Sequence, residues 1–256
     1  MPTYARLLGT PGLRHHGACL QPPAGLPAAL LYYLAYTGSW VSREELSFLF
    51  WADVPEEKAR KNLRNLLVRI KEFSYTEGLE TERSRVRWQV EIDVRAFHEA
   101  VQGQDVQRIV KIYEGEFLAG FYLDDALEFS AWLERERQFL HCQWREGSLN
   151  LASSLESKGD YTQAAEILAA LTEVDPLDEE SLCRQLEHLQ QRGDTSKALR
   201  LFETFQQRLG RDLGGVPKPA TLALVAALRQ AHVPPPTLQK VSAKARRLDQ
   251  IIRFCT

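Results

Sequence analysis

The sequence predicts a mainly α-helical protein whose few strands are confined to its first 92 residues. Short runs of alternating apolar residues occur only in that part of the chain, whereas apolar residues at helical spacing dominate the rest. A helical pattern also repeats at an offset of 34 residues. With 256 residues the chain is long enough for two ordinary domains, and its content of 44% hydrophobic and 26% charged residues is typical of a folded protein.

The N-terminal residues carry signals for a hairpin followed by three helices. Alternating residues in "TYARLLG" and "HHGACLQ", on either side of "TPG", predict a short antiparallel hairpin. "LPAALLYYLAYTG" then predicts a buried helix that ends at Gly38, and Ser42 with Glu45 has the capping-box spacing that begins a second helix. A third helix is predicted over residues 55–73.

The third predicted helix holds a basic cluster without an acid. Residues 58–71 contain six Lys or Arg, although the chain as a whole has a net charge of −2. At about 100° per residue, one side of the helix is apolar and faces a core: Ala59, Leu63, Leu66, Leu67, Ile70 and Phe73. The remaining surface carries Arg60, Lys61, Arg64, Asn65, Val68 and Lys71. Charge patterning alone favours a merely solvated helix face, so the neighbouring elements decide the interpretation.

The segment after this helix predicts a second hairpin. In "GLETERSRVRWQVEIDV", Arg83, Arg85 and Arg87 alternate with apolar residues that face inward. Three helices followed by a hairpin are typical of a winged helix-turn-helix, whose third helix enters the major groove of DNA. The sequence therefore predicts a winged-helix DNA-binding domain over residues 1–92.

Each exposed residue of the third helix has a chemistry that suits a particular DNA contact. Arg60 or Arg64 would contact guanine, and Asn65 would contact adenine. Val68 would touch a thymine methyl group. Lys61 and Lys71 are better suited to phosphates, which set affinity but not sequence preference.

The rest of the chain predicts an all-α domain of helical repeats. "GDYTQAAEILAAL" begins at Gly159 and "GDTSKALRLFETF" at Gly193, and this offset is the period of tetratricopeptide (TPR) repeats. Ala164 and Ala198 are the equivalent small residues at which paired helices approach closely. We expect a TPR-like domain over residues 93–232 that folds without the first domain. Residues 233–256 contain three consecutive prolines and then basic residues, which predict a linker and a basic tail.

Charge and motifs narrow the classes of function. The three segments have net charges of +2, −8 and +4 in chain order, which indicates different partners for each. Nucleotide-binding loops, H-E-x-x-H and G-x-S-x-G are all missing, so we expect neither an enzyme nor a bound cofactor. The cysteines lack metal-ligand spacing, and His15 and His16 are expected to point to opposite faces, so no metal site is expected. Without a signal sequence or an apolar span, the expected location is the cytoplasm, in association with the nucleoid.

Several motifs resemble a known family. "VSREELSFLFW" followed by "ARKNLRNLLVRIK" resembles the OmpR-type winged helix of the SARP family of bacterial transcriptional activators. "YEGEFLAGF", "WLERERQFL", "VDPLDEES" and "LGRDLGGVPKPATLAL" are similar to that family's bacterial transcriptional activator domain. The resemblance implies an activator that binds double-stranded promoter DNA, with the helical domain supporting a homodimer or contacts to RNA polymerase. It also implies wing contacts from Arg83 and Arg85, although "VRWQV" replaces the family's usual Gly-Tyr step.

A second interpretation of the same residues stays open. The chain would then be a TPR-type protein–protein interaction adaptor without direct DNA binding. In that case the basic helix would dock on an acidic protein surface, and the repeats would bind a peptide in their concave groove.

Overall fold

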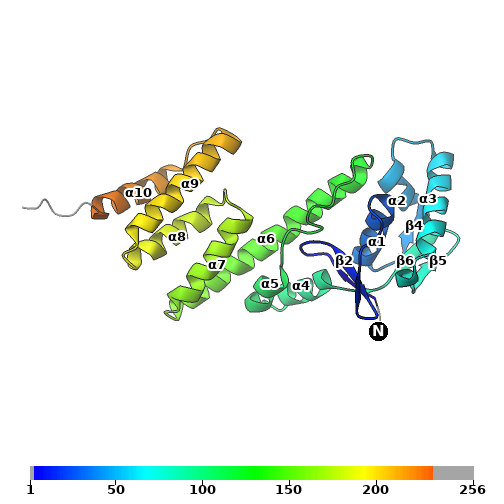
Figure 1. The fold of residues 1–256 in the computed structure, drawn as a ribbon, viewed down its shortest axis with the longest axis horizontal. Coiled ribbons are helices and arrows are strands. Elements are labelled where there is room, and N and C mark those ends of the chain that lie inside the picture. Colours follow the sequence, from blue (N-terminus) through cyan, green and yellow to red (C-terminus); the bar gives the residue numbers. More distant parts are fainter. Residues whose placement is uncertain (1–2, 233–256) are drawn as a thin grey trace, which may run out of the picture. The chain divides into compact units, whose positions relative to one another are not determined.

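A computed structural model gives the structure of residues 3–232 (Figure 1). The chain forms two compact units, Met1–Val174 (unit 1) and Asp175–Thr256 (unit 2). Within the described residues, every strand lies before residue 93 and the later elements are helices, so the predicted mainly helical fold class is confirmed. The expected linker and basic tail over 233–256 lie outside the described residues.

Unit 1 begins with the predicted winged helix-turn-helix. Its helices are α1 (Leu26–Thr37), α2 (Arg43–Trp51) and α3 (Glu56–Lys71), followed by a short 3-10 turn, η1 (Ser74–Thr76). Its strands are β1 (Tyr4–Arg6), β2 (Gly12–His15), β3 (Ala18–Leu20), β4 (Val41–Ser42), β5 (Leu79–Thr81), β6 (Arg85–Trp88) and β7 (Glu91–Ile92). They form two sheets, one in the order β3-β2-β1-β7 and one in the order β4-β6-β5, and the second contains the wing hairpin β5–β6.

Local signals set the ends of the first two helices as the sequence predicts. The α1 helix is buried along most of its length and ends at Gly38, whose left-handed backbone (φ 62°) lets its N–H donate to the Leu34 carbonyl. The hydroxyl of Ser42 accepts a hydrogen bond from the Glu45 N–H at 3.0 Å and so caps α2. Both predicted helix boundaries are confirmed.

The N-terminal hairpin has one strand more than the sequence predicts. The β1 and β2 strands pair antiparallel across Gly9–Pro11, and a second turn at His16–Gly17 leads into β3. Both residues of this turn have positive φ, 48° and 86°. The left-handed turn interrupts strand alternation, so the prediction that His15 and His16 point apart is wrong, and their ring centroids lie 4.2 Å apart.

The helices of unit 1 that follow the winged helix are fastened to its first strand. They are α4 (Asp93–Gln102), α5 (Val106–Ile112), α6 (Leu127–Ser157) and α7 (Tyr161–Val174). The carboxylate of Asp93 accepts hydrogen bonds from the backbone N–H groups of Leu7, Leu8 and Val94, each at 2.9 Å. The first residue of the predicted second domain therefore anchors the chain just after β1.

A loop between α5 and α6 forms a second connection to the same segment, just after β1. The Leu118 N–H donates to the Leu7 carbonyl at 2.7 Å, and the Ala119 N–H donates to the Gly9 carbonyl at 3.0 Å. Arg137 of α6 holds this loop, because its guanidinium donates to the carbonyls of Phe117, Leu118 and Phe121 at 2.9–3.0 Å. The "YEGEFLAGF" and "WLERERQFL" motifs therefore meet at one buried arginine.

One hydrophobic core spans the two parts of unit 1. It extends from Ala5 to Leu171 and includes winged-helix residues such as Phe50 together with Phe129 and Trp132 of α6. Phe50 and Phe129 stack with their ring centroids 5.3 Å apart. Cutting the chain at residue 93 would expose both sides of this core to water. We therefore no longer expect residues 93–232 to fold without the winged helix, because the compact units divide after Val174 instead.

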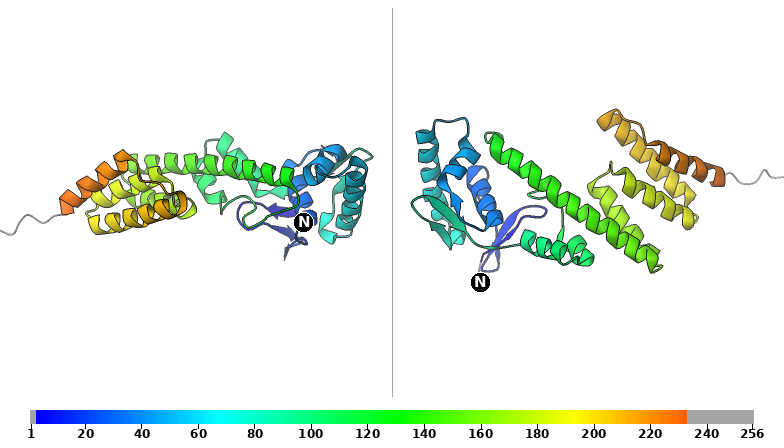
Figure 2. Two further views of the ribbon diagram at one scale, coloured as in Figure 1. Left: turned by 90° about the horizontal axis from the view of Figure 1, so that it is seen from above. Right: turned by 180° about the vertical axis from the view of Figure 1, so that it is seen from behind.

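The predicted helical repeat is present. Gly159 (φ 81°) and Gly193 (φ 77°) end one helix and precede the next, and Ala164 and Ala198 are both fully buried. In unit 1 the repeat helix α7 packs against α6, and Figure 2 shows the long α6 helix from two further directions. Unit 2 contains α8 (Glu179–Gln191), α9 (Thr195–Leu213) and α10 (Pro219–His232), which enclose a separate core around Phe202 and Phe205.

Gly147 is required where α6 meets α5. A Cβ atom at this position would lie 2.8 Å from Cγ2 of Ile109, whose β-branched side chain has little freedom to move. We expect Gly147→Ala to lower the free energy of unfolding by about 1 to 2 kcal/mol, because overpacking outweighs the better helix propensity of alanine. Chemical denaturation followed by tryptophan fluorescence measures the unfolding free energy of unit 1, since all five tryptophans lie in that unit.

Asn150→Ala is the matched control for that substitution. Asn150 is an exposed residue of the same helix, so alanine there should raise stability slightly, by about 0.5 kcal/mol. An unchanged or higher unfolding free energy for Gly147→Ala would contradict the close helix contact.

Candidate nucleic-acid interface

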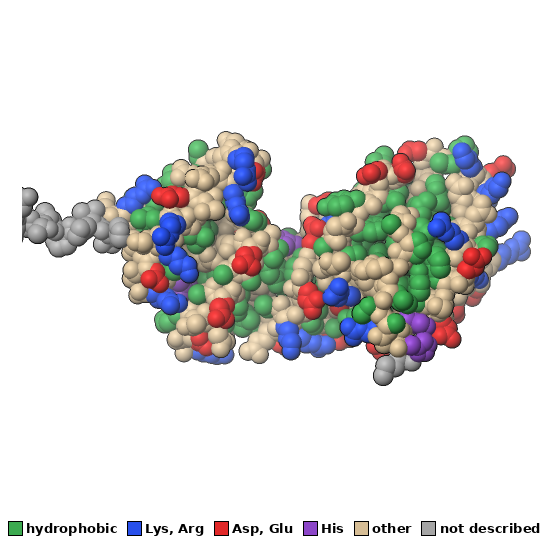
Figure 3. All heavy atoms as spheres, viewed as in Figure 1, with side chains coloured by type: hydrophobic (Ala, Val, Ile, Leu, Met, Phe, Trp, Pro, Cys, Tyr) green, Lys and Arg blue, Asp and Glu red, His purple; other side chains and the backbone are tan. Residues whose placement is uncertain are grey.

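The α3 helix has the two faces that the sequence predicts. Its predicted apolar residues Ala59 to Ile70 are buried, and Phe73, which follows the helix, is partly buried. On the other face the exposed residues are Arg60, Lys61, Arg64, Asn65, Val68 and Lys71, together with Lys58 and Arg69. Figure 3 shows Lys and Arg side chains along the edge of unit 1 on which α3 lies. The helix spans Glu56–Lys71, slightly shorter than the predicted 55–73.

Three polar residues in the middle of this face are available for a partner. Within the described chain, Lys61, Arg64 and Asn65 make no hydrogen bond or ion pair with another residue. Val68 is 59% exposed one turn from Arg64, as its angular position predicts. A free Arg, Asn and apolar side chain on one helix face offer donors, an acceptor and a methyl contact for base edges.

Two of the predicted contact residues on α3 have intramolecular partners. Arg60 forms an exposed ion pair with Glu56, one turn earlier on α3. Lys71 donates to the Thr81 hydroxyl of β5, which ties the end of α3 to the wing. Exposed pairs of this kind are weak, so a phosphate can replace Glu56 as the partner of Arg60. Helix periodicity allows the Arg60–Glu56 pair, because the two residues are four apart on one helix. It cannot predict the contact of Lys71, which reaches a different element.

The wing arginines differ in how they are held. Arg85 donates to the Glu82 carboxylate at 2.7 Å and lies 4.4 Å from the ring centroid of Trp40. Arg87 pairs with Glu80 at 2.7 Å and contacts the same ring at 4.8 Å. The hydrogen bond from Arg85 lowers the pKa of the Glu82 carboxyl. The wing strands therefore carry arginines that are already oriented by Trp40 and two acids.

Arg83 lies at the wing turn and is the least constrained of these arginines. It is exposed between β5 and β6, and it has no hydrogen bond or ion pair among residues 3–232. The family resemblance implies wing contacts from both Arg83 and Arg85, but in the structure Arg83 is unpaired, whereas Arg85 stacks on Trp40 and pairs with Glu82. Trp40 itself was missed, because nothing in its local sequence indicates that it packs beside strand β6.

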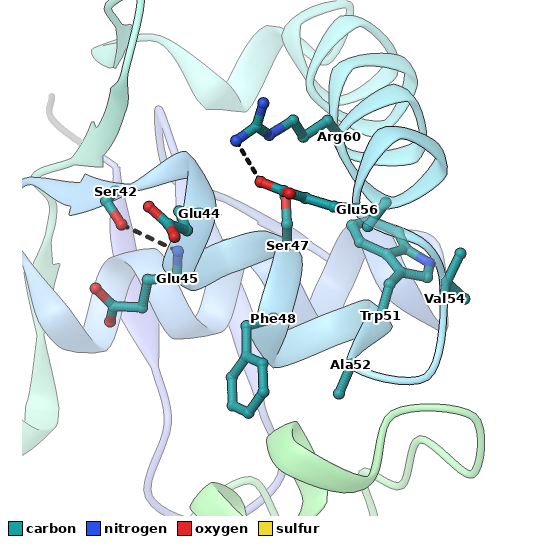
Figure 4. A pocket seen from close by; sticks show the side chains of 11 residues that line it. Ser42, Glu44, Glu45, Ser47, Phe48, Trp51, Ala52, Val54, Glu56 and Arg60 are labelled. Atoms are coloured by element: carbon teal, nitrogen blue, oxygen red, sulfur yellow. Dashed lines mark hydrogen bonds and ion pairs between the residues drawn. The ribbon is translucent and has the colours of Figure 1, made fainter.

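An open cavity of about 520 Å³ lies between α2 and α3, beside Arg60. Figure 4 shows Phe48 and Trp51 projecting from α2, and Glu56 paired with Arg60 on α3. Phe48 is 59% exposed. The carboxylate of Glu45 at its rim accepts a hydrogen bond from the Tyr33 hydroxyl at 2.8 Å. The cavity therefore joins an apolar surface to the basic face, and it contains no nucleophile paired with a base.

A comparison with protein families decides what kind of protein carries this interface. The family model described as "Bacterial transcriptional activator domain" matches residues 90–229, which is more than half of the chain. The chain belongs to the bacterial transcriptional activator domain family. This membership confirms the resemblance to SARP-type regulators, and it identifies the chain as a transcription regulator and not an enzyme.

A solved structure supports the fold of this family member. The chain is similar to "Mycobacterium tuberculosis EmbR in complex with low affinity phosphopeptide", with a TM-score of 0.58 and 17% sequence identity. The similarity covers 98% of this chain and 71% of the EmbR chain. Comparison with curated protein sequences gave no match. Within residues 3–232, the family member has no helix with the length and apolar character needed to cross a bilayer.

Proposed function

We propose that this transcription regulator is a sequence-specific activator that reads promoter DNA with α3. The observation that carries the proposal is the acid-free middle of α3, where Lys61, Arg64 and Asn65 are exposed and unpaired. Arg83 at the wing turn adds a free cation on the same unit. A third helix with a base-reading face and a wing with a backbone-binding cation are the two contacts that a winged helix makes with a duplex.

The proposal assigns distinct roles to the residues of the interface. Arg64 and Asn65 contact base edges, and Val68 contacts a thymine methyl group. Arg60, Lys61 and Lys71 contact phosphates or, in the case of Arg60, a guanine. In the wing, Arg83 contacts the backbone or the minor groove, and Arg85 acts from its position on Trp40.

Base contacts and phosphate contacts should respond differently to substitution. We expect Arg64→Ala to weaken binding to the preferred site by about 1 to 3 kcal/mol and to relax the preference at one base pair. Lys61→Ala should weaken binding to all sequences by about the same factor and reduce the salt dependence. Titration of preferred and scrambled duplexes with each variant measures both effects.

Arg135→Ala is the control for these titrations, because Arg135 is an exposed arginine of α6 that lies outside the interface. It should bind both duplexes as the wild type does. If Arg64→Ala and the wild type gave the same curve on the preferred site, Arg64 would have no part in reading the sequence.

The adaptor interpretation predicts a different response to salt. If α3 binds DNA, affinity should fall steeply between about 50 and 200 mM salt, because neutralised phosphates release counterions. An adaptor would instead form a complex with protein only, and nucleic-acid binding would be absent or unselective. The exposed cations of α3 support the first reading, and the excess of acids over bases in residues 93–232 suits a protein partner.

The proposal includes two partners for the helical region, a second copy of the chain and RNA polymerase. A homodimer on DNA would place two α3 helices on one promoter, and a contact to RNA polymerase would account for activation. The proposed location is the cytoplasm, in association with the nucleoid. The proposal includes no cofactor.

A further inference from the structure

Two histidines and a glutamate lie together at one edge of unit 1. His15 ends strand β2, His16 occupies the turn before β3, and Glu77 follows η1 in the segment that leads to the wing strand β5. One potential ligand atom from each of these residues lies within 4.8 Å of the others. The residues come from segments about 60 positions apart in the sequence, so the tertiary fold creates this cluster.

Thr3 holds the first histidine in a defined orientation. The buried Thr3 hydroxyl donates its proton to the Tyr75 carbonyl at 3.2 Å. Nδ1 of His15 lies 2.9 Å from the hydroxyl oxygen of Thr3. A hydroxyl has only one proton to donate, so Thr3 must accept the second hydrogen bond from the Nδ1–H of His15. In the neutral imidazole this leaves the Nε2 lone pair available to bind an ion.

The same hydroxyl explains why Glu77 is near the histidines. Thr3 joins the Tyr75 backbone to His15, and Glu77 follows Tyr75 by only two residues. A hydrogen bond to the second ring nitrogen is the usual support of a metal-binding histidine. The buried Thr3 hydroxyl therefore helps to hold the three side chains close together, in addition to the conformations of the exposed side chains themselves.

We propose that His15, His16 and Glu77 bind one divalent transition-metal ion of the zinc class, which links the β2–β3 turn to the segment entering the wing. Two imidazoles and one carboxylate are ligands that Zn²⁺ accepts, with water at the fourth position. Zinc bonds of about 2.0–2.2 Å place the ligand atoms roughly 3.3 Å apart. The ligand atoms lie within 4.8 Å of one another, and rotation of the exposed side chains of His16 and Glu77 can bring them to that spacing.

Metal binding would restrain the segment leading into the wing. The ion would connect the sheet β3-β2-β1-β7 to residues just before β5, which belongs to the other sheet. An ion that binds only the folded chain stabilises it by mass action. We therefore expect Zn²⁺ to raise the melting temperature of unit 1, whether or not the chain binds DNA. This inference is independent of the proposed function.

The test uses the full chain without a histidine tag. The probe is Zn²⁺. Calorimetric titration should give one saturable Zn²⁺ site per chain, and Mg²⁺, which prefers oxygen ligands, should not compete. His15→Gln, His16→Asn and Glu77→Gln should each weaken Zn²⁺ binding about tenfold or more and abolish the rise in melting temperature. Asparagine is chosen at position 16 because it tolerates the left-handed backbone there.

Two controls separate this site from other zinc ligands. Glu72→Gln, an exposed carboxylate after α3 that lies outside the cluster, should bind Zn²⁺ as the wild type does. A variant with the exposed Cys19 and Cys142 both changed to serine should also bind normally. The proposal is overturned if no saturable binding occurs at micromolar Zn²⁺, if the three variants bind like the wild type, or if the serine variant loses binding.

Discussion

Arg137→Met is expected to lower the free energy of unfolding of unit 1 by about 3 kcal/mol, because buried carbonyl groups would lose a charged donor. The guanidinium is almost fully buried and donates to the carbonyls of Phe117, Leu118 and Phe121. Methionine keeps much of the side-chain volume but provides no N–H group. The loop that pairs with β1 would then lose its support from α6.

Chemical denaturation followed by tryptophan fluorescence reports this change selectively, since all five tryptophans belong to unit 1. Arg135→Met is the matched control, because Arg135 is exposed on the same helix two residues earlier. Surface substitutions of this kind change stability by less than about 0.5 kcal/mol. If both variants unfolded at the same denaturant concentration, the buried guanidinium would have no role in joining the helices to the winged helix.

Joining two half-sites should raise DNA affinity by about 10² to 10⁴ over a single half-site, if two protomers bind through their helical regions. One winged helix buries only about 600 to 1,000 Å² on DNA, and abundant non-specific sites compete with it. Two linked protomers make the second contact intramolecular. For binding on one face of the duplex, the half-site centres should lie about 10 to 10.5 bp apart.

Spacing variants of the duplex provide the control for this prediction. Inserting about 5 bp turns the second half-site to the opposite face and should remove most of the gain, whereas inserting about one full turn should restore part of it. The mass of the complex on a two-half-site duplex gives the number of protomers directly. One protomer bound with full affinity to one half-site would contradict the dimeric arrangement. The resemblance to SARP regulators suggests direct repeats of the half-site.

The family match and the hydrophobic core of unit 1 show that the winged helix and the matched activator region share packing. Residues 90–229 match the activator domain, yet the compact units divide after Val174. Asp93 and Arg137 belong to the matched region, and both hold backbone close to β1 or the loop that pairs with it. A substitution at either residue should therefore destabilise the winged helix through shared packing, without changing the exposed face of α3 that we propose binds DNA.

The sequence determined the features that depend on neighbours along the chain. The apolar stripe of α3, the Ser42 cap, the Gly38 helix end and the repeat at Gly159 and Gly193 all follow from spacing within one helix or one turn, and the structure contains each of them. Exposure of the predicted α3 residues could be deduced in the same way, because the face opposite a core-facing stripe must meet solvent.

Only the tertiary structure decided which of those exposed residues are free and which are engaged. Lys71 donates a hydrogen bond to Thr81, Arg85 stacks on Trp40, and Asp93 accepts hydrogen bonds from the amides after β1. These partners are separated by 10 to 86 residues in the sequence. Periodicity predicts which way a side chain faces, but it carries no information about which distant surface lies opposite. The pairing of His15 with His16 and Glu77 has the same origin, because a left-handed turn and a buried threonine bring together residues that strand alternation would separate.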